Sequence, residues 1–224
     1  MSHYEIEIKS LLGNEEKAIA LIEKMRTTDT NLSITGKSSQ LNHYFTGGDI
    51  HELYEKVEHL FSGTQHDKFK MIAEKGKDFS VRTRQKDEEV LLVIKASLDG
   101  GTSSNSVSRL EFEEPIAITL EEIDELVKSA GYTYEAKWSR ERVEYAYKDI
   151  VVCLDKNAGY GYLAEFEKVT DDEASLAEIK VRLEDIMAEL EVEELSQERL
   201  ARMFAYYNAN WSDYYGTEKT FTIE

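Results

Sequence analysis

The sequence predicts an α+β protein built on an eight-stranded antiparallel β-barrel, polar inside and wrapped by helices. Two observations carry this prediction. Several strand-length segments alternate charged with apolar residues, and the segments between them have helical apolar stripes that begin at capping residues. Because successive side chains of a strand point to opposite faces, one face of the sheet must be apolar and the other charged. Such a sheet covers its apolar face with helices and curls its charged face around something wet.

The first predicted strand, residues 4–12, shows the alternation clearly. Glu5, Glu7 and Lys9 share one face, and Ile6 and Ile8 occupy the other. Two carboxylates this close on one face repel each other unless basic groups or a cation lie opposite. A solvated strand edge would also explain one such segment, but the pattern returns in four later segments.

Those four segments carry charges of both signs. They contain Arg82 and Arg84; Arg109, Glu111 and Glu113; Arg140 and Arg142; and Glu165 and Glu167. Most of the intervening positions are apolar or small, with Glu141 as the exception. We therefore expect the charged faces to line a hydrophilic tunnel inside the barrel.

Helices are expected at five places in the chain. They run from the capping residue Asn14 to about residue 25, from Asp49 to about 61, from Thr119 to Gly131, from Thr170 to about 190, and from Ser196 onwards. The other strands are expected at 40–45, 79–85, 90–97, 107–114, 132–147, 150–155 and 161–169. Residues 62–68 and the connector 97–106 read as flexible loops, and 69–77 fits either a helix or a strand. The predicted single domain spans residues 1–224, with the C-terminal helices of about 170–210 packed on the barrel.

Composition limits the classes of function. Of the 224 residues 41% are hydrophobic and 32% charged, which is typical of a soluble protein. No apolar run approaches the roughly 20 residues of a membrane span, and no secretory signal begins the sequence, so a cytoplasmic protein without membrane contact is expected. Cys153 is the single cysteine, which agrees with a reducing compartment and favours a buried packing role.

Net charge argues against nucleic acid as a partner. The formal charge is −18, whereas duplex binding needs a basic surface. The charged motifs differ from the rest of the chain, because their bases and acids are equal in number. A small polyanion can therefore bind inside a protein whose other residues repel large polyanions.

The ordered set of motifs is similar to that of a known family. Glu5-x-Glu7-x-Lys9, Arg82-x-Arg84, Lys95, Arg109-x-Glu111-x-Glu113, Arg140-x-Arg142, Asp155 and Glu165-x-Glu167 follow one another along nearly the whole chain. This set resembles the CYTH superfamily of triphosphate tunnel metalloenzymes, which includes thiamine triphosphatases, inorganic tripolyphosphatases and class IV adenylyl cyclases. The sequence departs from the pattern at Arg140, where lysine is frequent, and in the long segment 46–78.

The motif residues suit the chemistry of bound phosphates. Guanidinium groups fork onto phosphate oxygens, and lysines add point charges. The predicted substrate-binding residues are Lys9, Arg82, Arg84, Lys95, Arg109, Arg140 and Arg142. By analogy with the family, Lys9 also shields the leaving phosphate oxygen, so Lys9 and Glu7 are the predicted catalytic residues.

The acids suit a hard divalent cation that bridges them to phosphate. Carboxylates are ligands that Mg²⁺ and Mn²⁺ accept, and Glu5, Glu7, Glu165 and Glu167 supply two pairs on strand faces. The resemblance adds Asp155 to these metal ligands. Glu111 and Glu113 are expected to orient the arginines, with a second metal site as the alternative.

The predicted function is metal-dependent hydrolysis of a triphosphate, either inorganic tripolyphosphate or an organic triphosphate such as thiamine triphosphate or a nucleotide. A class IV-type adenylyl cyclase is the first alternative, and a non-catalytic module that binds polyphosphate or nucleotide is the second. No base-reading motif identifies an organic part of the substrate. A homodimer is compatible with the apolar helix surfaces, but the sequence does not decide it.

Overall fold

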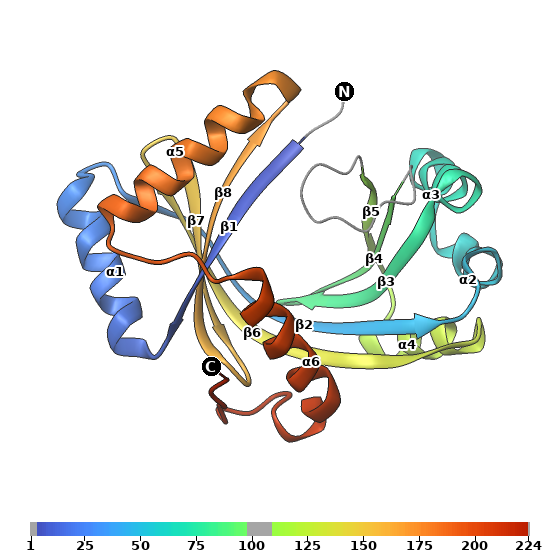
Figure 1. Ribbon diagram of the computed structural model, residues 1–224. Helices are drawn as coiled ribbons and strands as arrows, with labels where there is room; N and C mark the ends of the chain where they lie inside the picture. Colours follow the sequence, from blue (N-terminus) through green and yellow to red (C-terminus); the bar gives the residue numbers. More distant parts are fainter. Residues whose placement is uncertain (1–3, 98–108, 224) are drawn as a thin grey trace. The chain divides into compact units, whose positions relative to one another are not determined.

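Eight strands form one antiparallel sheet, which confirms the predicted α+β class. The computed structural model describes residues 4–97 and 109–223, apart from the side chains of Tyr4, Glu5, Arg109 and Glu173. The strand order is β1-β8-β7-β6-β2-β3-β4-β5 (Figure 1). Among the described residues no hydrogen-bonded pairing joins β1 to β5, so the closed barrel stays a prediction. Most of the predicted loop 97–106 lies outside the described residues.

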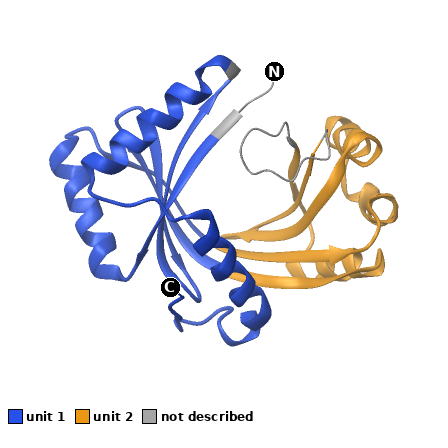
Figure 2. Cartoon of the chain, in the orientation of Figure 1, with its two compact units in different colours: residues 1–39, 139–224 blue, residues 40–138 orange. Residues whose placement is uncertain are grey.

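The chain divides into two compact units (Figure 2). Unit 1 comprises residues 1–39 and 139–224, and unit 2 comprises residues 40–138. Strands β2 (Ser33–Gly47) and β6 (Tyr132–Tyr147) each contribute residues to both units. The division leaves the prediction of a single domain untested.

Unit 1 packs helices on one face of its strands. Its other strands are β1 (Tyr4–Gly13), β7 (Ile150–Asn157) and β8 (Gly161–Thr170). Its helices are α1 (Glu15–Thr28), α5 (Leu176–Glu189) and α6 (Gln197–Asn210). Short 3-10 turns lie at Glu173–Ser175 and Trp211–Asp213. Helices α1 and α5 lie against these strands (Figure 1), and Leu21, Leu183 and Phe166 are buried between them. Asn14 caps α1 as predicted, because its side chain accepts a hydrogen bond from the Lys17 amide.

Unit 2 has the same two-layer construction. Its other strands are β3 (Lys77–Lys86), β4 (Glu89–Ser97) and β5 (Arg109–Ile116), and its helices are α2 (Ile50–Val57), a 3-10 turn (Glu58–Leu60), α3 (Gly63–Lys75) and α4 (Leu120–Ser129). Leu53, Phe69, Leu92 and Phe112 are fully buried in its core. The apolar positions of the alternating segments therefore face the helices, as the sequence predicts.

Three predicted elements need correction. Residues 62–68 are not a loop, because Ser62 is the N-cap of α3 and residues 63–68 form its first half, while its second half buries Phe69, Ile72 and Ala73. Strand β2 begins at Ser33 rather than near residue 40. Thr170 does not cap the following helix, because a 3-10 turn intervenes and α5 begins after Ser175. The box of Thr119 and Glu122, by contrast, caps α4 as predicted.

A buried polar network attaches α4 to the strands of unit 2. Asp124 accepts hydrogen bonds from the hydroxyls of Thr83 and Tyr134, both at 2.6 Å, and lies 2.7 Å from Nδ1 of His43. Burial raises the pKa of the Asp124 carboxyl, but these hydrogen bonds outweigh burial, so the pKa lies below its usual range. The carboxylate is therefore stable in its charged form inside the unit.

Within residues 4–97 and 109–223, no helix is both long enough and apolar enough to cross a bilayer.

Candidate active site

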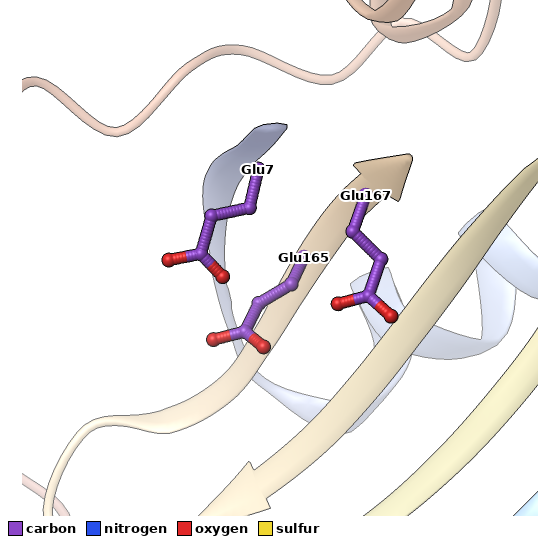
Figure 3. A group of neighbouring side chains, drawn as sticks. All are labelled: Glu7, Glu165 and Glu167. Carbon is purple, nitrogen blue, oxygen red and sulfur yellow. The ribbon is translucent and has the colours of Figure 1, made fainter. Parts of the chain in front are cut away.

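Three glutamates of unit 1 bring their carboxylates together. Glu7 lies on β1, and Glu165 and Glu167 lie on the neighbouring strand β8 (Figure 3). The antiparallel register sets Glu7 opposite Glu167 and Lys9 opposite Glu165, so all four side chains share the face away from the core. One oxygen from each of the three carboxylates lies within 4.8 Å of the others. We call Glu7, Glu165 and Glu167 the acidic group.

Lys9 partly neutralises the acidic group. Its Nζ lies 2.5 Å from Oε1 of Glu7 and 3.3 Å from Oε1 of Glu165. Burial lowers the pKa of Lys9, but the attraction of these two carboxylates outweighs burial, so the pKa is raised. Lys9 is therefore a fixed cation at the edge of the group.

The acidic group fits a divalent cation that prefers oxygen ligands. Three carboxylates so close together repel one another, although Lys9 and Arg142 offset part of their charge. Mg²⁺ and Mn²⁺ bind carboxylate oxygens and leave positions for other oxygen ligands. The predicted metal ligands Glu7, Glu165 and Glu167 are thus brought together, whereas the side chain of Glu5 lies outside the described residues.

Arginines hold the other acids of this face. Arg142 on β6 donates from Nε to Oδ1 of Asp155 at 2.6 Å and from Nη2 to Oδ2 at 2.7 Å, and it also pairs with Glu165. Arg140 donates to Oδ2 of Asp155 at 2.7 Å. Asp155 therefore binds two arginines and is not part of the acidic group. Its role as a metal ligand stays a prediction.

The same arrangement fixes the charge of Glu165. Its side chain is about one-tenth exposed. Burial raises the pKa of Glu165, but Lys9 and Arg142 outweigh burial and lower the pKa below its usual range. Arg142 has a raised pKa for the reciprocal reason, since its acidic partners outweigh the effect of burial. The face therefore combines charged groups of both signs.

Cys153 lies on this charged face. In the β7–β8 register it is opposite Glu165, and its side chain is fully buried. Burial raises the pKa of the thiol well above its usual range. The sequence correctly predicts a buried cysteine, but the side chain faces the charged residues instead of the apolar core.

Unit 2 carries a second set of charged residues on the non-core face of its strands. Arg84 on β3 donates from Nη1 to Oε1 of Glu113 on β5 at 2.7 Å and from Nε to Oδ1 of Asn42 on β2 at 2.7 Å. Lys95 on β4 pairs with Glu111 on β5 at 2.9 Å. Glu111 and Glu113 thus each pair with a base, Lys95 and Arg84 respectively, and their role in orienting the arginines stays a prediction.

Arg82 differs from these bases. It forms no ion pair with any residue that the structure describes, and its Nε is buried without a hydrogen-bond partner. Its Nη1 donates to the hydroxyl of Tyr44 at 3.1 Å, and its guanidinium lies over the Tyr44 ring, 4.7 Å from the ring centre. Arg82 is therefore a base with unused capacity for an anion. Of the predicted substrate-binding residues only Arg109 has a side chain outside the described residues.

Sequence reasoning misses several residues on these faces. Asn42 and Tyr44 contact the two arginines of β3, and Trp138 packs edge-to-face with Tyr44. Glu144 lies opposite Cys153 in the β6–β7 register. The alternation of Gln40, Asn42 and Tyr44 is the signal that could have identified the first two, since polar residues there occupy one face of a strand.

Comparison with known proteins identifies one matching family. A family model described as the CYTH domain matches residues 65–201. No curated protein sequence gives a significant match.

Solved structures share the fold. A conserved hypothetical protein from Pyrococcus furiosus has a TM-score of 0.58 at 19% identity, over 88% of this chain and 94% of that one. A putative adenylate cyclase from Vibrio parahaemolyticus has a TM-score of 0.57 at 16% identity, over 92% and 99%. A putative adenylyl cyclase from Hippeastrum, described as revealing a dominant triphosphatase activity, has a TM-score of 0.51 at 16% identity, over 92% and 96%. At these identities the likeness concerns the fold alone.

Proposed function

Since this chain belongs to the CYTH family, we propose that it hydrolyses the terminal phosphoanhydride bond of a triphosphate with Mg²⁺ or Mn²⁺ as cofactor. The acidic group beside Lys9 is the observation that carries the proposal, because holding an anion alone does not require three converging carboxylates. The substrate class includes inorganic tripolyphosphate, thiamine triphosphate and nucleoside triphosphates.

The proposal assigns the substrate phosphates to the bases. Arg82, Arg84 and Lys95 in unit 2, and Lys9, Arg140 and Arg142 in unit 1, supply guanidinium and ammonium donors on strand faces. Several such donors are needed because a triphosphate carries several negative charges. The closed tunnel predicted from the sequence is part of the proposal and is supported by family membership.

Glu7 and Lys9 are the proposed catalytic residues. Glu7 is 45% exposed in its side chain, so its carboxylate can accept a hydrogen bond from the attacking water. Lys9 is a permanent cation that can stabilise the charge that develops on the leaving phosphate oxygen. A divalent ion held by the acidic group would supply Lewis acidity and charge neutralisation. We also propose that the protein acts in the cytoplasm on small polyanions and not on nucleic acid.

A substrate panel tests the proposal. The protein is incubated with tripolyphosphate, ATP or thiamine triphosphate, each with Mg²⁺ or Mn²⁺, and released phosphate is measured. We expect turnover of at least one substrate, and a loss of at least about 100-fold in Glu165→Gln and Glu167→Gln, which is the size reported for removal of one strong transition-state contact. Glu141→Gln is the matched control, because this exposed glutamate of β6 lies between Arg140 and Arg142 in the sequence.

The products decide between hydrolysis and the alternatives. Cyclic AMP and pyrophosphate from ATP would identify a cyclase instead of a hydrolase. Tight binding without any product would identify a non-catalytic module. Turnover that Glu165→Gln and Glu167→Gln leave intact would reject the proposed site.

A further inference from the structure

Tyr44 and Trp138 form an aromatic pair on unit 2 that the core does not use. Their ring centres are 6.3 Å apart and the ring planes are inclined at 61°. Both side chains are partly exposed, and neither belongs to the buried cluster of the unit, which takes its rings from Phe45, Phe69, Phe112 and others. Partly exposed aromatic rings beside charged groups suit a binding surface.

Strand register sets Tyr44 beside Arg82, one of the proposed phosphate-binding bases. Tyr44 on β2 is directly opposite Arg82 on β3, so the two side chains share the non-core face. His43 and Thr83, on the other face of the same strands, bind Asp124 in the interior. Arg82 contacts the Tyr44 ring through its guanidinium and keeps a buried Nε without a partner. An anion bound by Arg82 would therefore lie next to the aromatic pair.

The combination matches the chemistry of an organic phosphate. A guanidinium binds phosphate oxygens. An aromatic side chain stacks on the face of a planar base or similar heterocycle and needs no hydrogen bonds to the atoms at the edge of that ring. Inorganic tripolyphosphate has no group that could use the two rings. We propose that Tyr44 and Trp138 bind the aromatic heterocycle of an organic triphosphate, so that the preferred substrate is organic. This inference rests on the proposed function.

Kinetic specificity is the first test. Values of kcat/KM are measured for ATP, thiamine triphosphate and tripolyphosphate with the parent chain, Tyr44→Leu and Trp138→Leu. We expect the ratio of kcat/KM for the preferred organic substrate to that for tripolyphosphate to fall by roughly tenfold in each variant, as for one lost stacking contact. Comparing ATP with thiamine triphosphate identifies which heterocycle binds.

A conservative variant separates stacking from support of Arg82. Tyr44→Phe keeps the ring and removes the hydroxyl that accepts a hydrogen bond from Arg82. We expect Tyr44→Phe to retain the parental ratio. If Tyr44→Phe and Tyr44→Leu lower kcat/KM equally for organic and inorganic substrates, Tyr44 only supports the arginine and the proposal is wrong.

A binding measurement keeps the inference testable without turnover. The chain has two tryptophans, so Trp211→Phe leaves Trp138 as the single tryptophan, which is excited selectively at wavelengths that tyrosine does not absorb. We expect the preferred one of ATP and thiamine triphosphate to quench Trp138 emission in this variant and tripolyphosphate to leave it nearly unchanged. Quenching without any hydrolysis would refute the proposed function alone. Hydrolysis with equal responses to all three compounds would refute the heterocycle site alone.

Discussion

Arg142 and Asp155 form a two-point ion pair between β6 and β7, with Nε–Oδ1 at 2.6 Å and Nη2–Oδ2 at 2.7 Å. The Asp155 side chain is fully buried and the Arg142 side chain is 12% exposed. Arg142 also pairs with Glu165 of the acidic group. The buried pair therefore sets the position of a guanidinium that borders the candidate metal ligands.

We expect Asp155→Ala to lower the free energy of unfolding by about 3–5 kcal/mol, because it leaves Arg142 in the interior without its main partner. Urea unfolding followed by circular dichroism measures the change, with Glu141→Gln as the surface control. An unchanged stability together with a loss of Mn²⁺ binding would indicate that Asp155 is a metal ligand instead.

Removing one carboxylate of the acidic group should weaken divalent cation binding. We expect Glu165→Gln to raise the Kd for Mn²⁺ by at least about tenfold, since a charged ligand becomes neutral. Titration calorimetry with MnCl₂ and no substrate measures this change. The control is again Glu141→Gln, and equal affinities in the parent and both variants would contradict a metal site here.

Asp124 should make unit 2 sensitive to acid. Its folded-state pKa is lowered, so its stabilising effect is present above the unfolded-state pKa of about 3.9 and is lost as the pH falls through the folded-state pKa. We expect Asp124→Asn to lower the free energy of unfolding at pH 7 by about 1–3 kcal/mol. The difference from the parent should shrink as the pH falls below about 4. Urea unfolding of the parent and of Asp124→Asn at several pH values measures this difference in the free energy of unfolding. A difference that does not change with pH would contradict the lowered pKa of Asp124.

Gly161 should tolerate no side chain. Its φ is +72°, and an added Cβ would lie 2.1 Å from the carbonyl oxygen of Gly13. Gly216 has a similar φ of +69° but no atom within 4 Å of an added Cβ. We expect Gly216→Ala to cost about 1–2 kcal/mol from backbone conformation alone, and Gly161→Ala to cost distinctly more. Thermal unfolding of the two variants measures the difference, and equal losses would show that the contact with Gly13 relaxes freely.

The sequence predicted which side chains share a face of a strand, but it did not predict which strands pair with each other. Alternation in residues 4–12 and 161–169 was sufficient to place Glu7, Lys9, Glu165 and Glu167 on non-core faces, because that periodicity is local. It did not indicate that β1 pairs with β8, since pairing depends on contacts between distant segments. The grouping of the three carboxylates therefore needed the structure.

Local sequence patterns did not predict elements whose structure depends on packing against distant parts of the chain. Gly63 and Thr64 are weak helix formers, and α3 is stabilised by burial of Phe69 and Ile72 further along. Strand β6 is continuous, yet its core residues change parity, from Tyr132 and Tyr134 in unit 2 to the odd-numbered positions in unit 1. Trp138 escaped prediction because its contact with Tyr44 joins two separate strands, and a local pattern does not show such a contact.

The division of the chain has a consequence for synthesis on the ribosome. Unit 2 is one continuous segment, whereas unit 1 joins residues 1–39 to residues 139–224. Strand β1 finds its partner β8 only after residue 170 has been made, and the carbonyl of Lys9 accepts its hydrogen bond from the amide of Leu195 later still. Strand β1 therefore lacks its partner until residue 170 has been synthesised, and the candidate metal ligands Glu7, Glu165 and Glu167 assemble only after that point.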